Sequence, residues 1–125
     1  MKSKIELWML LMSFGTILVI PFIPSLSYAD QEHYKITIQN HQFEPQALSV
    51  PANQKIKLIV ENLDPTPEEF ESYHLNREKI IAAKGQITLY LGPLKPGEYQ
   101  YFGDFHQNTA KGLIIAKEDM EGGQK

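Results

Sequence analysis

Short runs of β-forming residues, separated by turn residues about every ten positions, extend from residue 34 to residue 117. The first run, residues 34–39, alternates apolar and polar side chains, which is typical of a strand with one buried face. Many short strands joined by turns pack as an antiparallel sandwich or barrel. We therefore expect an all-β domain of about seven strands. They are expected at residues 34–39, 47–50, 55–61, 69–72, 86–91, 98–102 and 112–117.

Three other segments carry a weaker pattern. Residues 43–45 (FEP) indicate a bend, because proline limits strand pairing. Residues 75–80 fit either one helical turn or an irregular crossing, and the sequence does not separate the two. The polar residues 118–125 are expected to form a frayed C-terminal tail.

The first 29 residues have the pattern of a secretory signal peptide. Lys2 and Lys4 give a positive start, and a largely apolar run follows from residue 7 to residue 23. A small-x-small pattern ends at Ala29, after which we expect cleavage. A membrane anchor is the alternative, since the apolar run is nearly long enough. The expected organisation is a signal peptide (1–29), one domain (30–117) and a tail (118–125).

The composition excludes several classes of function. The chain contains no cysteine, so it has no disulfides, thiolate metal sites or thiol nucleophiles. Lys and Arg number 12 against 15 Asp and Glu, and no basic stripe is present. Nucleic acid is therefore not an expected partner. A domain without disulfides depends on its hydrophobic core for stability.

Three segments resemble the cupredoxins: residues 43–52 (FEPQALSVPA), 67–72 (PEEFES) and 91–112, which contain GDFH. The resemblance covers the whole domain and implies a cupredoxin-like Greek-key β-sandwich. More narrowly, these segments and residues 77–79 (REK) resemble the EfeO-type cupredoxin-like domains associated with bacterial iron-permease systems.

The sequence departs from the blue copper proteins at the metal ligands. Those sites use two histidines, a cysteine thiolate and a weak axial methionine. Here the cysteine position is Gly103, and the axial region (residues 109 and 110) holds no methionine. Glu68 and Glu69 stand where the upstream histidine is expected, so His106 is the one ligand retained. A type 1 blue-copper centre is therefore excluded.

The replacements still offer metal ligands. Glu69 and Glu71 share one face if their segment is a strand, and the resemblance places the loop carrying Asp104 and His106 beside it. Oxygen ligands with one imidazole suit iron or Cu(II) better than Cu(I). A solvated acidic face is the alternative interpretation of these carboxylates. The expected ligands are Glu69, Glu71, Asp104 and His106, with Glu68 and His74 in reserve; His33 and His41 are not expected to bind.

The resemblance implies a periplasmic metal-binding accessory protein of an iron-uptake system, with iron or copper as its ion. It would assist Fe(II) oxidation or delivery to a permease, and its partner would be an iron-permease complex or another periplasmic iron-binding protein. Ferroxidase-type activity stays open, with no catalytic residue assigned. The alternative is a metal-free β-sandwich interaction module that docks on a membrane transport complex.

Overall fold

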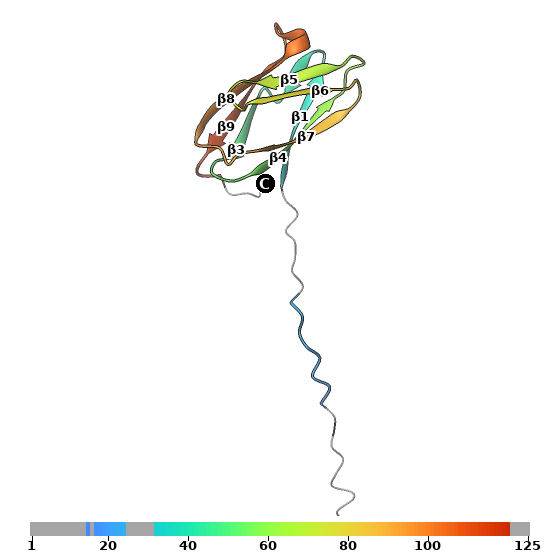
Figure 1. Cartoon of the computed structure of the whole chain (residues 1–125), viewed down its shortest axis with the longest axis vertical. Helices are drawn as coiled ribbons and strands as arrows, with labels where there is room; N and C mark the ends of the chain where they lie inside the picture. The colour runs from blue at the N-terminus through green and yellow to red at the C-terminus, as the bar shows by residue number, and fades with distance from the viewer. Residues whose placement is uncertain (1–14, 16, 25–31, 121–125) are drawn as a thin grey trace, which may run out of the picture.

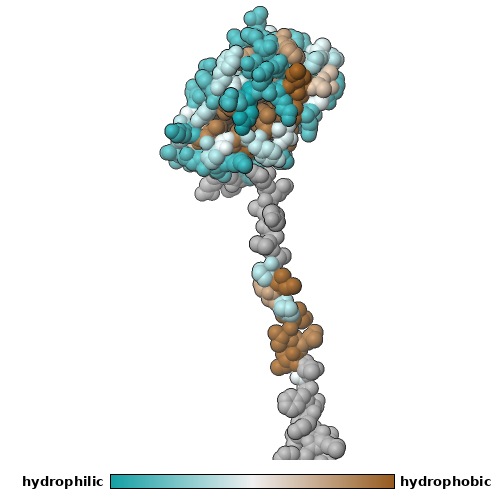
Figure 2. Space-filling model, viewed as in Figure 1, coloured by the Kyte–Doolittle hydropathy of each residue, from teal (hydrophilic) through white to brown (hydrophobic). Residues whose placement is uncertain are grey.

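The computed structural model describes residues 15, 17–24 and 32–120 (Figure 1). Most of the predicted signal peptide, including the cleavage site after Ala29, and the last five residues of the predicted tail lie outside the described residues. Within the described ranges, no helix is both long enough and apolar enough to cross a membrane. Residues 17–24 carry exposed apolar side chains, whereas the visible face of the folded domain is largely hydrophilic (Figure 2).

The described domain is a sandwich of two β-sheets, which confirms the predicted all-β fold (Figure 1). One sheet has the strand order β2-β1-β4-β7, and the other has the order β3-β9-β8-β5-β6. Nine strands are present rather than about seven. The elements are β1 (His33–Gln39), β2 (Gln42–Glu44), β3 (Ala47–Pro51), β4 (Ile56–Asn62), β5 (Glu68–Ser72), β6 (Arg77–Ile81), β7 (Gln86–Leu91), β8 (Gly97–Gly103), the 3-10 helix η1 (Asp104–His106) and β9 (Lys111–Lys117).

The two additional strands lie where the sequence was least clear. The expected bend at residues 43–45 overlaps β2, which pairs with β1 across a two-residue turn. The expected helical turn or crossing at residues 75–80 is largely β6, which pairs antiparallel with β5. Both are edge strands. Four of the five β6 residues are exposed, so no buried face appears as alternation in the sequence.

The sheets are mixed and not purely antiparallel. β1 runs parallel to β4, and β3 runs parallel to β9. The other strand pairs, such as β4 with β7 and β8 with β9, are antiparallel. Parallel neighbours need a crossover connection, and here the chain passes through the opposite sheet between the paired strands. The expectation of antiparallel packing throughout was therefore wrong for these two pairs.

The core lies between the sheets and is centred on three aromatic side chains. Phe43 and Tyr101 meet edge to face with ring centroids 4.9 Å apart, and Phe70 stacks on Tyr101 at 5.0 Å. The Tyr101 ring fills the space beside Gly112, where a Cβ would lie 2.1 Å from the tyrosine Cζ. β4 alternates buried and half-buried residues along its whole length. This close packing fixes the strands that lead into the loops at one end of the sandwich.

Candidate metal centre

A buried carboxylate, Glu68, begins strand β5 and is 1% exposed. Its Oε1 accepts hydrogen bonds from the backbone N–H groups of Glu69 (3.0 Å) and Phe105 (2.9 Å). Its Oε2 lies 2.6 Å from His106 Nδ1. A carboxylate removed from water is stable only with partners of this kind. Glu68 therefore ties β5 to η1, the short helix at the end of the sandwich drawn in orange in Figure 1.

Gly103 provides the room for this carboxyl group. A Cβ on residue 103 would lie 2.6 Å from Glu68 Cδ and 2.7 Å from the Ala110 Cβ. Real Cβ atoms do not approach other heavy atoms so closely, so any side chain here would displace a neighbour. The Glu68 side chain thus occupies the space that a side chain on residue 103 would need, and the sequence resemblance equates residue 103 with the thiolate position of blue copper proteins.

Two histidines complete a group that we call the His–Glu–His site: His41, Glu68 and His106. The two imidazole rings are stacked, with centroids 3.5 Å apart and an interplanar angle of 12°. One ligand atom from each of the three residues lies within 4.8 Å of the other two. Both histidines are half-buried. The group thus offers two imidazole nitrogens and one carboxylate oxygen at one end of the sandwich.

His41 reaches this site from the turn between β1 and β2. Asn40 and His41 have φ angles of 53° and 57°, in the left-handed region, which costs roughly 1 kcal/mol for a residue other than glycine. Asp64, 6% exposed, accepts hydrogen bonds from both backbone N–H groups, at 2.8 and 2.9 Å. Burial favours the neutral acid, but these bonds and the nearby charges of His41 and Lys84 hold the pKa of Asp64 below its ordinary value.

A second group, the acidic cluster, comprises Glu69, Glu71 and Asp104, whose carboxylate oxygens also lie within 4.8 Å of one another. A hydrogen bond with Glu78, partial burial and the surrounding negative charges raise the pKa of Glu69 to about 7. Partial burial, followed by the charges of Asp104 and Glu78, raises the pKa of Glu71. Crowded carboxylates thus hold protons that isolated ones release, and a cation would relieve the repulsion.

The expected ligands fall into two groups rather than one. Glu69 and Glu71 share one face of β5, as their spacing predicted, and Asp104, which the resemblance placed beside this segment, belongs to the same group. His106 instead contacts Glu68, whose side chain lies on the buried face of β5. The reserve ligand His74 belongs to neither group, since its Nδ1 accepts the backbone N–H of Gln100 at 3.0 Å.

The sequence analysis did not expect His41, which forms part of the His–Glu–His site. Its signal in the sequence is the pair Asn40–His41 between two short β runs. This is a weak signal, because the usual two-residue hairpin turns contain glycine, as in Asn-Gly. Residues 43–45 were interpreted as a bend, so this hairpin was missed.

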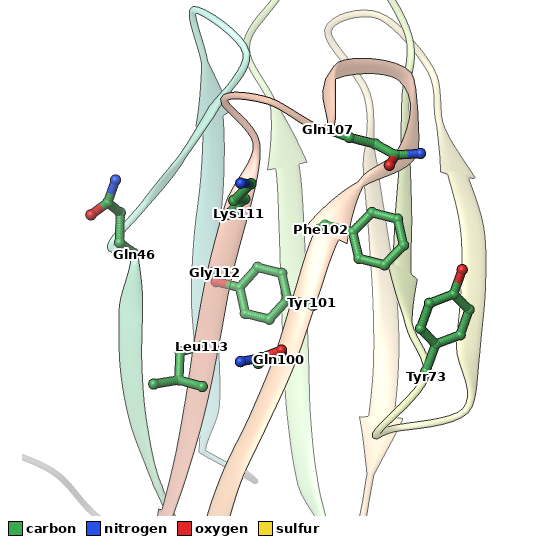
Figure 3. Close-up of a pocket in the computed structure, with 9 residues that line it drawn as sticks. All are labelled: Gln46, Tyr73, Gln100, Tyr101, Phe102, Gln107, Lys111, Gly112 and Leu113. Atoms are coloured by element: carbon green, nitrogen blue, oxygen red, sulfur yellow. The ribbon is translucent and has the colours of Figure 1, made fainter.

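A surface groove lies over β8 and β9 and borders the acidic cluster, since its lining residue Gln107 donates to Asp104 Oδ1 at 2.7 Å (Figure 3). Its volume is about 740 Å³. Amide and aromatic side chains line it, and its single charged side chain is Lys111. It contains no histidine or carboxylate ligand, so the metal-binding chemistry of the described residues lies at the η1 end.

A two-sheet β-sandwich with imidazole and carboxylate side chains gathered at one loop end has the architecture of a cupredoxin-type domain. Residues 7–116 match the family described as cupredoxin-like domain. The chain belongs to that family. This confirms the predicted family, while the narrower EfeO-type resemblance stays a prediction.

Known proteins share this sequence or this fold. The uncharacterized protein RP394 of Rickettsia prowazekii (strain Madrid E) is 54% identical over 84 residues, which cover 67% of each chain. The metal-binding domain of the Cu(I)-exporting P-type ATPase CopA of Streptococcus pneumoniae D39, solved with Cu(I), has a TM-score of 0.61 at 11% identity, covering 69% of this chain and 85% of that one.

Two other solved structures are also similar. Amicyanin from Paracoccus versutus has a TM-score of 0.56 at 13% identity, covering 69% of this chain and 82% of that one. A purple cupredoxin from Nitrosopumilus maritimus has a TM-score of 0.53 at 18% identity, covering 66% and 98%. At these identities the likeness shows the fold alone.

Type 1 blue copper does not fit the residues of this chain. Such a centre needs a cysteine thiolate, and the chain has no cysteine. The space next to Gly103 holds the Glu68 carboxyl group. Any ion bound here takes nitrogen and oxygen ligands.

Proposed function

We propose that this chain is an exported metal-binding protein that holds Cu(II) or an iron ion at the His–Glu–His site. The observation that carries the proposal is the buried Glu68 carboxylate, which lies against two imidazoles with all three ligand atoms within 4.8 Å. Buried carboxylates in proteins are generally paired or coordinate metals. Because two histidines lie beside this carboxylate, metal coordination is the favoured role.

The donor set selects the class of ion. Two imidazoles and one carboxylate suit Cu(II), Zn(II) and non-haem Fe(II), whereas Cu(I) prefers sulfur ligands. At equal supply, Cu(II) binds such ligands most tightly among the divalent first-row metals. Where copper is not supplied, as in a dedicated iron-uptake system, iron is the ion expected to bind.

The spacing of one donor pair, from Glu68 and His106, accommodates an ion after a small movement, whereas the stacked His41 ring must rotate to direct a nitrogen at the same ion. Two donors each about 2.0–2.1 Å from one ion, at angles between about 90° and 110°, are about 3 Å apart. His106 Nδ1 and Glu68 Oε2 are 2.6 Å apart. An ion therefore replaces the proton between them when the two side chains separate by a few tenths of an ångström, and binding releases that proton.

The acidic cluster supports a role in cation handling at the same end of the molecule. Glu69 adjoins Glu68 in β5, and Asp104 is two residues before His106 in η1. The negative charge of the acidic cluster attracts cations to this end of the molecule. The proposal keeps Glu69, Glu71 and Asp104 as ligands of a second, more exposed position.

The wider setting of the proposal is iron uptake in the periplasm, with an iron-permease complex or a periplasmic iron-binding protein as partner. The resemblance of residues 67–72, 77–79 and 103–106 to EfeO-type domains supports this setting. The signal-peptide pattern of residues 1–29 supports export.

A second candidate function is a metal-free interaction module that docks on a membrane transport complex. The hydrogen bonding of Glu68 favours it, since two backbone N–H groups and the His106 imidazole satisfy the carboxylate without an ion. In this case the histidines hold the loop end together, and the exposed Phe105 beside them contacts the partner.

Calorimetric titration of the protein, first stripped with a chelator, separates the two candidates. Cu(II), Fe(II), Fe(III) and Zn(II) are added separately to the wild type and to His41→Ala, Glu68→Gln and His74→Ala. His74 belongs to neither group, so its replacement is the matched control. The proposal expects stoichiometric binding that His41→Ala and Glu68→Gln weaken and His74→Ala does not. If none of these ions binds, the metal-free interaction module is the remaining candidate function.

A further inference from the structure

One carboxylate, Asp64, connects the loop after β4 to the turn that carries His41. Its Oδ1 accepts the Asn40 backbone N–H at 2.8 Å, and its Oδ2 accepts the His41 backbone N–H at 2.9 Å. Both donors lie in the left-handed region of the turn between β1 and β2. Each carboxylate oxygen thus accepts one backbone N–H group. The turn has a left-handed backbone conformation, which glycine adopts more readily than other residues.

Asp64 itself is held by the core. Its backbone N–H donates to Asn62 Oδ1 at 3.0 Å. The Asn62 side chain is fully buried, and its Nδ2 donates to the carbonyl of Thr66 at 2.8 Å. The same amide lies 3.4 Å from the carbonyl of Ile81 in β6. These hydrogen bonds fix Asp64 relative to both sheets, independently of its bonds to the turn between β1 and β2.

The position of the His41 ring follows from this clamp. Its Nδ1 lies 3.4 Å from Asp64 Oδ2, and its face stacks on the His106 ring. Nδ1 on the Asp64 side leaves Nε2 as the nitrogen free for an ion. A carboxylate behind a ligating imidazole is the usual arrangement around protein metal ions, because it fixes the ring and its tautomer.

We propose that Asp64 is the positioning residue of this centre. Asp64 holds the His41 imidazole against His106 and leaves Nε2 of His41 open to the ion. This rests on the function proposed above. The role requires a carboxylate, since the two N–H donors need two acceptor oxygens. An asparagine offers one acceptor and turns an N–H group towards the second donor.

A double-mutant cycle on the full chain tests the role. Cu(II) affinity is measured for the wild type, Asp64→Asn, His41→Ala and the double variant, with Asp119→Asn, an exposed aspartate after β9, as the matched control. Asp64→Asn is expected to weaken binding about 10- to 100-fold in the wild type. It should have no further effect once His41 is alanine, and Asp119→Asn should change nothing. Unchanged affinity in Asp64→Asn, or an equal loss in both backgrounds, would overturn the inference.

A second readout needs no metal and separates the two proposals. Stacked rings shift each other's ring protons upfield, so the NMR signals of His41 and His106 report the stack directly. Asp64→Asn should abolish these shifts at a pH where both rings are neutral. If the wild type binds no ion, the proposed function fails, and these shifts alone decide whether Asp64 positions His41: their loss supports the role and their retention overturns it.

If Asp64→Asn does not fold, Asp64→Glu takes its place in the test, because it keeps the charge and both acceptor oxygens. Its carboxylate is displaced by one methylene group, so the turn and the His41 ring must move. The expected result is again weaker Cu(II) binding and loss of the upfield shifts. Wild-type affinity and shifts in Asp64→Glu would contradict the inference.

Discussion

The carboxyl group of Glu68 fills the space that a side chain on residue 103 would need, since a Cβ there would lie 2.6 Å from Glu68 Cδ. The two residues lie on neighbouring strands, β5 and β8, where Gly103 pairs with Phe70, two residues after Glu68. The buried carboxylate and the glycine therefore form one structural unit. This unit places a buried carboxylate, rather than a side chain of residue 103, beside the His106 imidazole.

Gly103→Ala should destabilise the fold and disturb the His–Glu–His site together. The new Cβ must push the Glu68 carboxyl or the Ala110 side chain aside, and overpacking of this kind costs about 1–3 kcal/mol. Urea unfolding monitored by circular dichroism measures the loss. Metal affinity should fall as well, because Glu68 leaves its position beside His106.

The matched control for this prediction is Gly103→Ala in a Glu68→Ala background. Removing the carboxyl group eliminates one of the two close contacts, although the Ala110 Cβ remains. The additional cost of Gly103→Ala should be smaller there than in the wild type. An equal cost in both backgrounds would show that Glu68 and Gly103 are independent.

Glu69→Gln should stabilise the metal-free protein at pH 8 and leave it unchanged near pH 4. The Glu78 hydrogen bond, partial burial and nearby carboxylates raise the pKa of Glu69 from 4.5 to about 7. Between these values the folded state binds more protons than the unfolded state, so stability falls as pH rises. Glutamine removes the Glu69 contribution to this dependence, whereas the contribution of Glu71, whose pKa is also raised, remains. Urea unfolding of both proteins from pH 4 to pH 8 measures it.

Glu98→Gln, which replaces an exposed carboxylate on β8, is the control for the pH series. It should reproduce the wild-type dependence. A Glu69→Gln protein whose stability also declined between pH 4.5 and pH 7 like the wild type would show that the acidic cluster does not hold the proton.

Tyr101→Phe should raise the stability of the protein by about 1 kcal/mol. The Tyr101 ring packs between Phe43 and Phe70, but its hydroxyl is buried without a hydrogen-bond partner among the described residues. Phenylalanine keeps the ring contacts and removes the unsatisfied group. Thermal unfolding measures the difference.

Tyr99→Phe provides the contrast, because the Tyr99 hydroxyl donates to the Lys95 carbonyl at 2.8 Å on the exposed surface. Its removal should be neutral or slightly destabilising. If Tyr101→Phe were as destabilising as a lost buried hydrogen bond, about 1–2 kcal/mol, then the hydroxyl has a partner such as an ordered water.

The sequence predicted the strands whose alternation reports a buried face. β1, β4 and β7 were all expected, because their apolar residues recur at every second position. β6 was not, since only its last residue is buried and its pairing with β5 is what makes it a strand. Edge strands of this kind depend on the neighbouring chain and leave little local signal.

The candidate site shows the same division between local and tertiary information. The spacing of Glu69 and Glu71 placed them on one face of a strand, where they meet Asp104. The direction of His106 is set by the turn of η1, and it meets the opposite face of β5 at Glu68. The contribution of His41 depends on a clamp by Asp64, more than twenty residues away, which no local pattern reveals.

The most direct test of the central claim is electron paramagnetic resonance of the protein loaded with one equivalent of Cu(II), compared with His41→Ala. The account predicts a Cu(II) centre without blue-copper character, whose hyperfine structure reports two nitrogen ligands in the wild type and one in His41→Ala. A spectrum that is identical in the two proteins, or Cu(II) that stays unbound, would contradict a metal centre built from His41, Glu68 and His106.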